Sequence, residues 1–127
     1  MPAERRSRRI LEDERVCEAI SAIGEPENLT SWSGRFALLG DPSRLALLLA
    51  IANAGPISVT DLAVAADMND TTVSQALRLL RASGTVVARR DGRIVRYELA
   101  DDQIKKLLHP VAGPPAHRKK VAASKLS

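Results

Sequence analysis

Residues 59–81 decide the fold, and they read VTDLAVAADMNDTTVSQALRLLR. Apolar residues recur at helical spacing before and after a break at 67–69. The first run predicts a short helix that starts at Ser58 or Thr60, and the second predicts a helix over 71–81. Two helices joined by so short a turn form a helix-turn-helix unit.

The second of these helices has an apolar side and a polar side. Its apolar positions follow the spacing i, i+3, i+4 and i+7 from Val73 to Leu80, and Asn69 or Asp70 caps its start. Its other positions carry short hydrogen-bonding side chains and two arginines: Thr71, Thr72, Ser74, Gln75, Arg78 and Arg81. Such a face fits the major groove of DNA without steric clash.

A β-hairpin is predicted after this helix. Residues 85–90 and 93–99 are rich in Val, Arg, Ile and Tyr, and the pair Asp91-Gly92 between them is typical of a two-residue turn. The predicted cross-strand partners are Val86 with Tyr97 and Ala88 with Val95. The arginines on or beside the hairpin are Arg89, Arg90, Arg93 and Arg96.

Helix and hairpin together predict contacts with double-stranded DNA. Gln75 is a candidate partner for adenine, and Arg78 for guanine or a phosphate. The hairpin is a basic wing that would reach phosphates or a narrow minor groove. The alternative is a solvated helix position for Gln75 and an ordinary exposed hairpin whose arginines only solubilise it. The order of the elements favours the DNA-binding interpretation.

The elements around this core complete the expected fold. Further helices are predicted over 11–23, 30–39, 44–53 and 103–109. The fold class is therefore mostly α with a small β-hairpin, a winged helix-turn-helix in the order α-α-α-α-α-β-β-α.

One domain is expected, because 127 residues with 45% hydrophobic content build a single core of modest size. We expect a flexible basic arm over 1–10 and a flexible Pro/Lys/Arg-rich tail over 110–127. The DNA-binding and dimerisation domain is expected over 11–109. Two interpretations of the charged residues in the arm and tail stay open: they are only solvated, or they contact DNA phosphates.

Composition narrows the function. The chain has 19 Lys+Arg against 15 Asp+Glu, which favours a polyanionic partner, nucleic acid first. The 2% aromatic content argues against stacking on single-stranded bases. No nucleophile with a partner base, phosphate loop or convergent carboxylates is recognisable, so an enzyme is not expected.

A cytoplasmic location is expected. Cys17 has no partner for a disulfide and fits a reducing compartment. The charged stretch 1–15 lacks the apolar segment of a signal peptide, and the longest apolar run, 45–52, is too short to span a bilayer.

Four motifs carry a family resemblance: LLGDPSRL at 38–45, VTDLA at 59–63, VSQALRLL at 73–80, and RDGR at 90–93 followed by Tyr97. Their order resembles the ArsR/SmtB family of bacterial metal-sensing repressors over about 32–108. The resemblance implies a homodimer whose first and last helices form the interface. It also implies an inverted-repeat operator that is released when an effector binds. The apolar residues assigned to that interface are Ile20, Ile23, Ile104, Leu107 and Leu108, with packing in the core of one chain as the alternative.

The resemblance makes zinc, nickel or cobalt a candidate effector, but the known ligand patterns are incomplete. The cysteine ligands of some members match Ser58 and Thr60 here, so that site is absent. For a second site, between the paired last helices, Asp101 matches one ligand while Gln103 stands where a histidine is expected.

A rearranged metal site would be built across the dimer from Cys17, Asp101, Asp102, His109 and His117. In the favoured alternative, Cys17 is a small buried residue, His109 a cation at a helix end and His117 a tail residue. Oxidation of Cys17 and an organic inducer stay open.

Two other functional classes remain as alternatives. A winged-helix protein-interaction adaptor would bind without regard to DNA sequence and would persist at high salt. A nonspecific nucleoid-type DNA-binding protein would show the salt dependence without the sequence preference.

Overall fold

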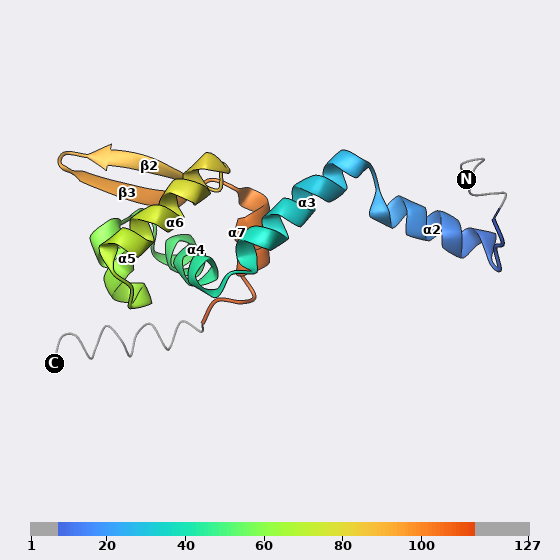
Figure 1. Cartoon of the computed structure of the whole chain (residues 1–127), viewed down its shortest axis with the longest axis horizontal. Coiled ribbons are helices and arrows are strands. Elements are labelled where there is room, and N and C mark those ends of the chain that lie inside the picture. The colour runs from blue at the N-terminus through green and yellow to red at the C-terminus, as the bar shows by residue number, and fades with distance from the viewer. Residues whose placement is uncertain (1–7, 114–127) are drawn as a thin grey trace. The chain divides into compact units, whose positions relative to one another are not determined.

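The computed structural model describes residues 8–113. Most of the predicted arm over 1–10, most of the predicted tail over 110–127, and His117 lie outside the described residues. The chain divides into two units, residues 1–37 and residues 38–127. The elements are α2 (Asp13–Ile23), α3 (Pro26–Leu39), α4 (Pro42–Ala54), β1 (Ile57–Ser58), α5 (Val59–Ala66), α6 (Asp70–Ala82), β2 (Val86–Asp91), β3 (Ile94–Leu99) and α7 (Asp102–Leu108) (Figure 1).

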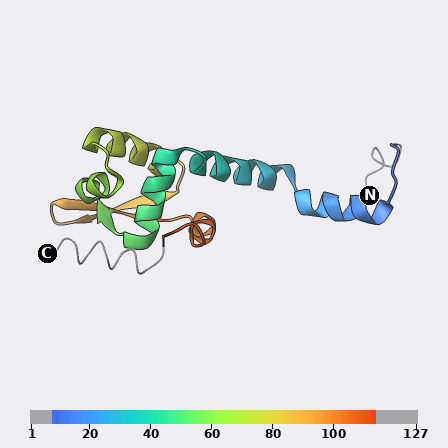
Figure 2. The same cartoon turned by 90° about the horizontal axis from the view of Figure 1, so that it is seen from below.

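The winged helix-turn-helix predicted from the sequence is confirmed in the second unit. Helices α4, α5, α6 and α7 and the sheet share one aliphatic core. Its buried members are Leu47, Leu48, Ile51, Leu62, Ala63, Val73, Leu77, Leu80, Val86, Ile104 and Leu108. Both views show β2 and β3 extending past α5 at the end of this unit opposite α7 (Figures 1 and 2).

The sheet has three strands rather than the two predicted. The order is β1-β3-β2, and all pairings are antiparallel. Strand β1 is only two residues long and pairs Ile57 with Tyr97 and Ser58 with Arg96. A segment this short carries no alternation, so only its pairing with β3 defines it as a strand.

The predicted register of the hairpin was wrong by two residues. Val86 pairs with Leu99, Ala88 with Tyr97 and Asp91 with Ile94, so Gly92 and Arg93 form the turn. Gly92 has φ +65°, whereas Asp91 and Arg93 have no positive φ. A type I′ turn over Asp91-Gly92 needs positive φ at both residues, while a type II′ turn needs it only at the first residue, a glycine. Gly92 is therefore the first of the two turn residues, as in a type II′ turn.

The first unit is helical and has no buried core among its described residues. Helices α2 and α3 contain no buried side chain. Helix α3 starts at Pro26, four residues before the predicted start, because proline suits the first position of a helix, where no N–H is needed. Trp32 and Phe36 lie with ring centroids 6.0 Å apart, and the Arg35 guanidinium lies 5.0 Å from the Trp32 ring centre.

Among residues 8–113, no single helix has both the length and the apolar character needed to cross a membrane. Only α3 and α4 taken together pass on those two properties alone.

Candidate nucleic-acid interface

Helix α6 is held in the core by one side and is open to solvent on the other. Val73, Leu77 and Leu80 are buried, and the Asn69 side chain accepts a hydrogen bond of 2.8 Å from the N–H of Thr72. Asn69, rather than Asp70, is thus the cap. The cap and the buried row fix both the start and the rotation of the helix.

The rotation of α6 sorts the predicted DNA-binding residues into three groups. At about 100° per residue, Thr71, Gln75 and Arg78 project opposite the buried row. All three are exposed. Ser74 and Arg81 lie on the flank toward the sheet, while Thr72 lies on the other flank. The outermost group therefore offers a hydroxyl, an amide and a guanidinium side by side.

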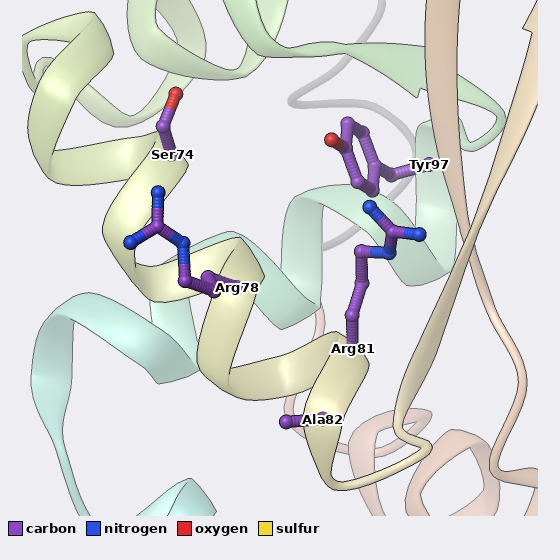
Figure 3. Close-up of a pocket in the computed structure, with 5 residues that line it drawn as sticks. All are labelled: Ser74, Arg78, Arg81, Ala82 and Tyr97. Carbon is purple, nitrogen blue, oxygen red and sulfur yellow. The ribbon is translucent and has the colours of Figure 1, made fainter.

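The flank toward the sheet forms a hollow of about 500 Å³. Ser74, Arg78, Arg81 and Ala82 line it from α6, and Tyr97 lines it from β3 (Figure 3). The sequence analysis places Tyr97 in a predicted strand and in a family motif, but assigns it no role in binding DNA. The alternation of β3 indicates which face it is on, but not that this face meets Arg81.

The wing arginines differ in their pairing. Arg89 forms an ion pair with Glu98, and Arg96 forms an ion pair with Asp91. Within residues 8–113, Arg90 and Arg93 have no ion-pair partner. The charges of Arg89 and Arg96 are each offset by a carboxylate of the same hairpin, Glu98 and Asp91. The positive charge that is not offset in this way belongs to Arg90 and Arg93.

A second hollow, of about 470 Å³, lies between the start of α5 and β3. It is lined by Ser58, Val59, Thr60, Asp61, Arg93, Ile94, Val95 and Arg96. The Ser58 hydroxyl accepts a hydrogen bond of 3.2 Å from the N–H of Asp61, so Ser58 is the cap of α5. The two positions compared with cysteine ligands thus carry a capping hydroxyl, on Ser58, and an exposed threonine, Thr60.

The candidate metal ligands are not brought together within the described part of one chain. Asp101 caps α7 and accepts hydrogen bonds from the N–H groups of Gln103 and Ile104 at 3.0 and 3.3 Å. His109 ends the same helix, about 12 Å away at 1.5 Å rise per residue. Cys17 is exposed on α2, so its interpretation as a buried residue was wrong. Residues 8–113 contain no cluster of three or more His, Cys, Asp or Glu suited to a metal ion.

The residues expected at a dimer interface divide into two groups. Ile104 and Leu108 are 0% and 2% exposed and belong to the core of the second unit, so they offer no surface to another copy. That part of the predicted interface is corrected, because the apolar row of α7 turns toward α4. Leu107 and Ile20 are half-buried, and Ile23 is 54% exposed.

Comparison with known proteins places the chain. The model of the MarR family matches residues 41–94. The transcriptional repressor SmtB homolog of Synechocystis sp. is 44% identical over 77 residues, 61% of this chain and 58% of that protein. The cadmium resistance transcriptional regulatory protein CadC homolog of Staphylococcus aureus is 30% identical over 88 residues, 69% of this chain and 70% of that protein. The chain belongs to the ArsR/SmtB family.

Solved structures of ArsR/SmtB-type regulators support the same assignment. Apo-NmtR is 38% identical with a TM-score of 0.59, covering 69% of this chain and 73% of that one. The homodimeric winged helix-turn-helix DNA-binding domain of Mb0332 from Mycobacterium bovis is 27% identical with a TM-score of 0.57, covering 91% of each chain. These relatives are named as regulators of transcription. Their names agree with the expectation that this chain is not an enzyme. The chain spans less than two thirds of the length of the SmtB homolog.

Proposed function

We propose that this member of the ArsR/SmtB family is a cytoplasmic, homodimeric, sequence-specific transcriptional repressor. In this proposal, α6 enters the major groove of an operator and the hairpin contacts the DNA backbone beside it. The observation that carries the proposal is the outer side of α6, where Thr71, Gln75 and Arg78 stand exposed opposite a buried row. A helix fixed on one side and rich in hydrogen-bonding groups on the other is suited to read base edges.

Charge supports the same docking. Arg78 on α6 and Arg90 and Arg93 on the hairpin have no carboxylate partner within residues 8–113. Unpaired arginines attract phosphates and contribute binding that weakens as salt rises. We therefore assign phosphate contacts to Arg90 and Arg93, and we give Arg89 and Arg96 a role in the structure of the wing. This narrows the set of DNA-binding arginines expected from the sequence.

A second copy of the chain completes the proposed repressor. One winged helix reads only a few base pairs, and two-fold symmetry doubles the site and calls for an inverted repeat. The apolar side chains of α2 and α3 supply the surface, because neither helix has a buried residue in the described part of one chain. The homodimeric Mb0332 domain is a precedent that covers 91% of this chain. Residues 11–109 would then hold both DNA binding and dimerisation.

An effector that releases the operator is part of the proposal, and a metal ion is the candidate that the relatives suggest. One relative is named for cadmium resistance. The described residues of one chain do not fit a metal ion, since Asp101 is a helix cap and His109 lies about two turns away. We therefore assign no ligand set, and the titration below tests zinc, nickel and cobalt without one.

Fluorescence anisotropy with the purified chain tests the function. Labelled promoter DNA and a scrambled duplex are titrated at several salt concentrations, with and without each metal. A repressor binds the promoter more tightly and shows a steep salt slope. Equal binding of both duplexes would favour a nucleoid-type protein, and the absence of salt-dependent DNA binding would favour a protein-interaction adaptor.

Two substitutions test the docking. Arg78→Ala should weaken promoter binding by about 1–3 kcal/mol and relax the preference at one base position, because Arg78 stands among the outermost residues of α6. Arg93→Ala should weaken promoter and scrambled DNA alike, because its contact is with a phosphate. Arg89→Ala combined with Glu98→Ala is the matched control, since it removes a wing arginine together with its paired carboxylate and leaves the net charge unchanged. Wild-type affinity in both Arg78→Ala and Arg93→Ala would show that the docking is wrong.

A further inference from the structure

We propose that the hollow between α6 and β3 is a binding site for one phosphate of the DNA backbone, with Arg81 and Tyr97 as its main ligands. This inference rests on the proposed function and deepens it. It separates Arg81 and Tyr97, which would fix the position of the protein on DNA, from Thr71 and Gln75, which face the bases.

The sequence spacing on α6 brings the donors into one row. Ser74, Arg78 and Arg81 are related as i, i+4 and i+7, so they lie above one another on a single side of the helix. Tyr97 stands across from this row on β3, and Figure 3 shows the Arg81 guanidinium directed toward the tyrosine ring. Two guanidinium groups and two hydroxyl groups therefore line one concave surface.

Tyr97 is held by structure on several sides. Its strand is central in the sheet, where Tyr97 pairs with Ile57 on one side and with Ala88 on the other. It is half-buried, and its side chain packs against the core. Because the strand and the core hold the Tyr97 ring in place, its hydroxyl is positioned before the ligand binds, and this lowers the entropic cost of binding.

The charge in the hollow is one-sided. Among residues 8–113, no acidic residue lines the hollow and neither Arg78 nor Arg81 has an ion-pair partner. Like charges three residues apart on a helix repel each other, so a bound anion would relieve the repulsion. The planar guanidinium donates two parallel hydrogen bonds to phosphate oxygens, and the hydroxyl of Tyr97 donates one more. A phosphate is the anion that satisfies this set.

The location of the hollow, between α6 and the hairpin, indicates that the phosphate belongs to the DNA backbone. Arg78 lines the hollow and also belongs to the outermost row of α6. Ala88 on β2 pairs with Tyr97 on β3. Arg90 lies two positions further along β2, toward the turn, so Arg90 is on the same face of the hairpin as Tyr97. Duplex DNA that meets the outer side of α6 and the hairpin passes over the hollow between them. A free phosphate or sulfate is the competing source.

The test uses two variants that alter the hollow little in shape. Arg81→Gln removes one charge, and Tyr97→Phe removes only the hydroxyl and keeps the ring that packs on the core. We expect Arg81→Gln to weaken promoter and scrambled DNA by the same factor, about tenfold, and to reduce the salt slope by about 1. Tyr97→Phe should weaken both duplexes about threefold with an unchanged slope, since a neutral donor displaces no counterion. Arg89→Gln combined with Glu98→Gln removes a wing guanidinium together with its paired carboxylate, leaves the net charge unchanged, and is the control that should keep the wild-type slope.

A scan with promoter duplexes that each carry one neutral methylphosphonate locates the contact. One position in each half of the inverted repeat should weaken binding by wild type but not by Arg81→Gln, because the two changes remove the same interaction. Three results would overturn the assignment. The first is wild-type affinity for DNA in both Arg81→Gln and Tyr97→Phe, and the second is an affinity loss for the promoter but not for the scrambled duplex. The third is a methylphosphonate scan in which wild type and Arg81→Gln respond alike at every position. Competition by inorganic phosphate at fixed ionic strength that Arg81→Gln abolishes would instead assign the hollow to a small anion. Failure of wild type to bind either duplex would overturn the proposed function, and this site with it.

Discussion

Gly55, the residue that caps the end of α4, lies close to the strand that carries Tyr97. A Cβ built on Gly55 would lie 2.5 Å from the carbonyl oxygen of Ile51 and 3.2 Å from that of Tyr97. Neither backbone atom can move without shifting the end of α4 or the central strand. The need for glycine here comes from a close approach, since the φ of −68° is open to any residue.

Gly55→Ala should therefore lower the free energy of unfolding by about 1–3 kcal/mol, the usual cost of an overpacked site. Thermal denaturation followed by circular dichroism measures it. Gly34→Ala on α3 is the control, because no atom of residues 8–113 lies within 4 Å of its added Cβ. The helix interior there should gain about 0.5–1 kcal/mol instead. An equal loss in the two variants would remove the steric explanation.

At the scale of the element, the start of α6 depends on one side chain. Asn69 accepts a hydrogen bond of 2.8 Å from the N–H of Thr72 in the first turn, next to Thr71. Asn69→Ala should cost about 1 kcal/mol and lower the midpoint of thermal unfolding by about 4–8 °C. Promoter binding should weaken as well, since the first turn carries Thr71. Asn69→Asp keeps an oxygen acceptor, so unfolding of this variant near the wild-type midpoint is the check on the capping explanation.

Local chemistry of this kind is the part of the fold that the sequence predicts well. The pair Asp41-Pro42 is a typical helix start, and the Asp41 carboxylate accepts a hydrogen bond from the N–H of Arg44 at 3.0 Å. For α5 and α6 the sequence leaves two candidates each, Ser58 or Thr60 and Asn69 or Asp70. The structure selects Ser58 and Asn69. A side chain that bonds a backbone group two or three residues away needs no information from the rest of the chain.

The hairpin register and the site that depends on it could not be predicted in this way. A shift of two residues leaves every side chain on the same face, so alternation cannot tell the two registers apart. The observed register brings Arg89 to Glu98 and Arg96 to Asp91, and thereby separates paired arginines from unpaired ones. The polar side of α6 was predictable from its own period, whereas the approach of Tyr97 to that helix comes from tertiary packing.

At the scale of the whole molecule, neither α2 nor α3 contains a residue buried by residues 8–113, and yet both helices carry large apolar side chains. Ile23, Leu29 and Phe36 are each more than half exposed. A second copy that covers these helices would remove that apolar surface from water at about 25 cal/mol per Å². The oligomer would thus bring together two α6 helices that one chain cannot pair.

Ile23→Glu should accordingly shift the protein from dimer to monomer, because a charge at a covered apolar position is left without a partner. Sedimentation velocity over a concentration series measures the shift, and anisotropy should show weaker promoter binding in parallel. Val64→Glu is the matched control for assembly, since Val64 is 71% exposed on α5 in the other unit. A dimer that survives Ile23→Glu as well as Val64→Glu would place the interface away from α2. Promoter binding undiminished in a monomeric Ile23→Glu variant would separate assembly from recognition and count against a two-fold operator.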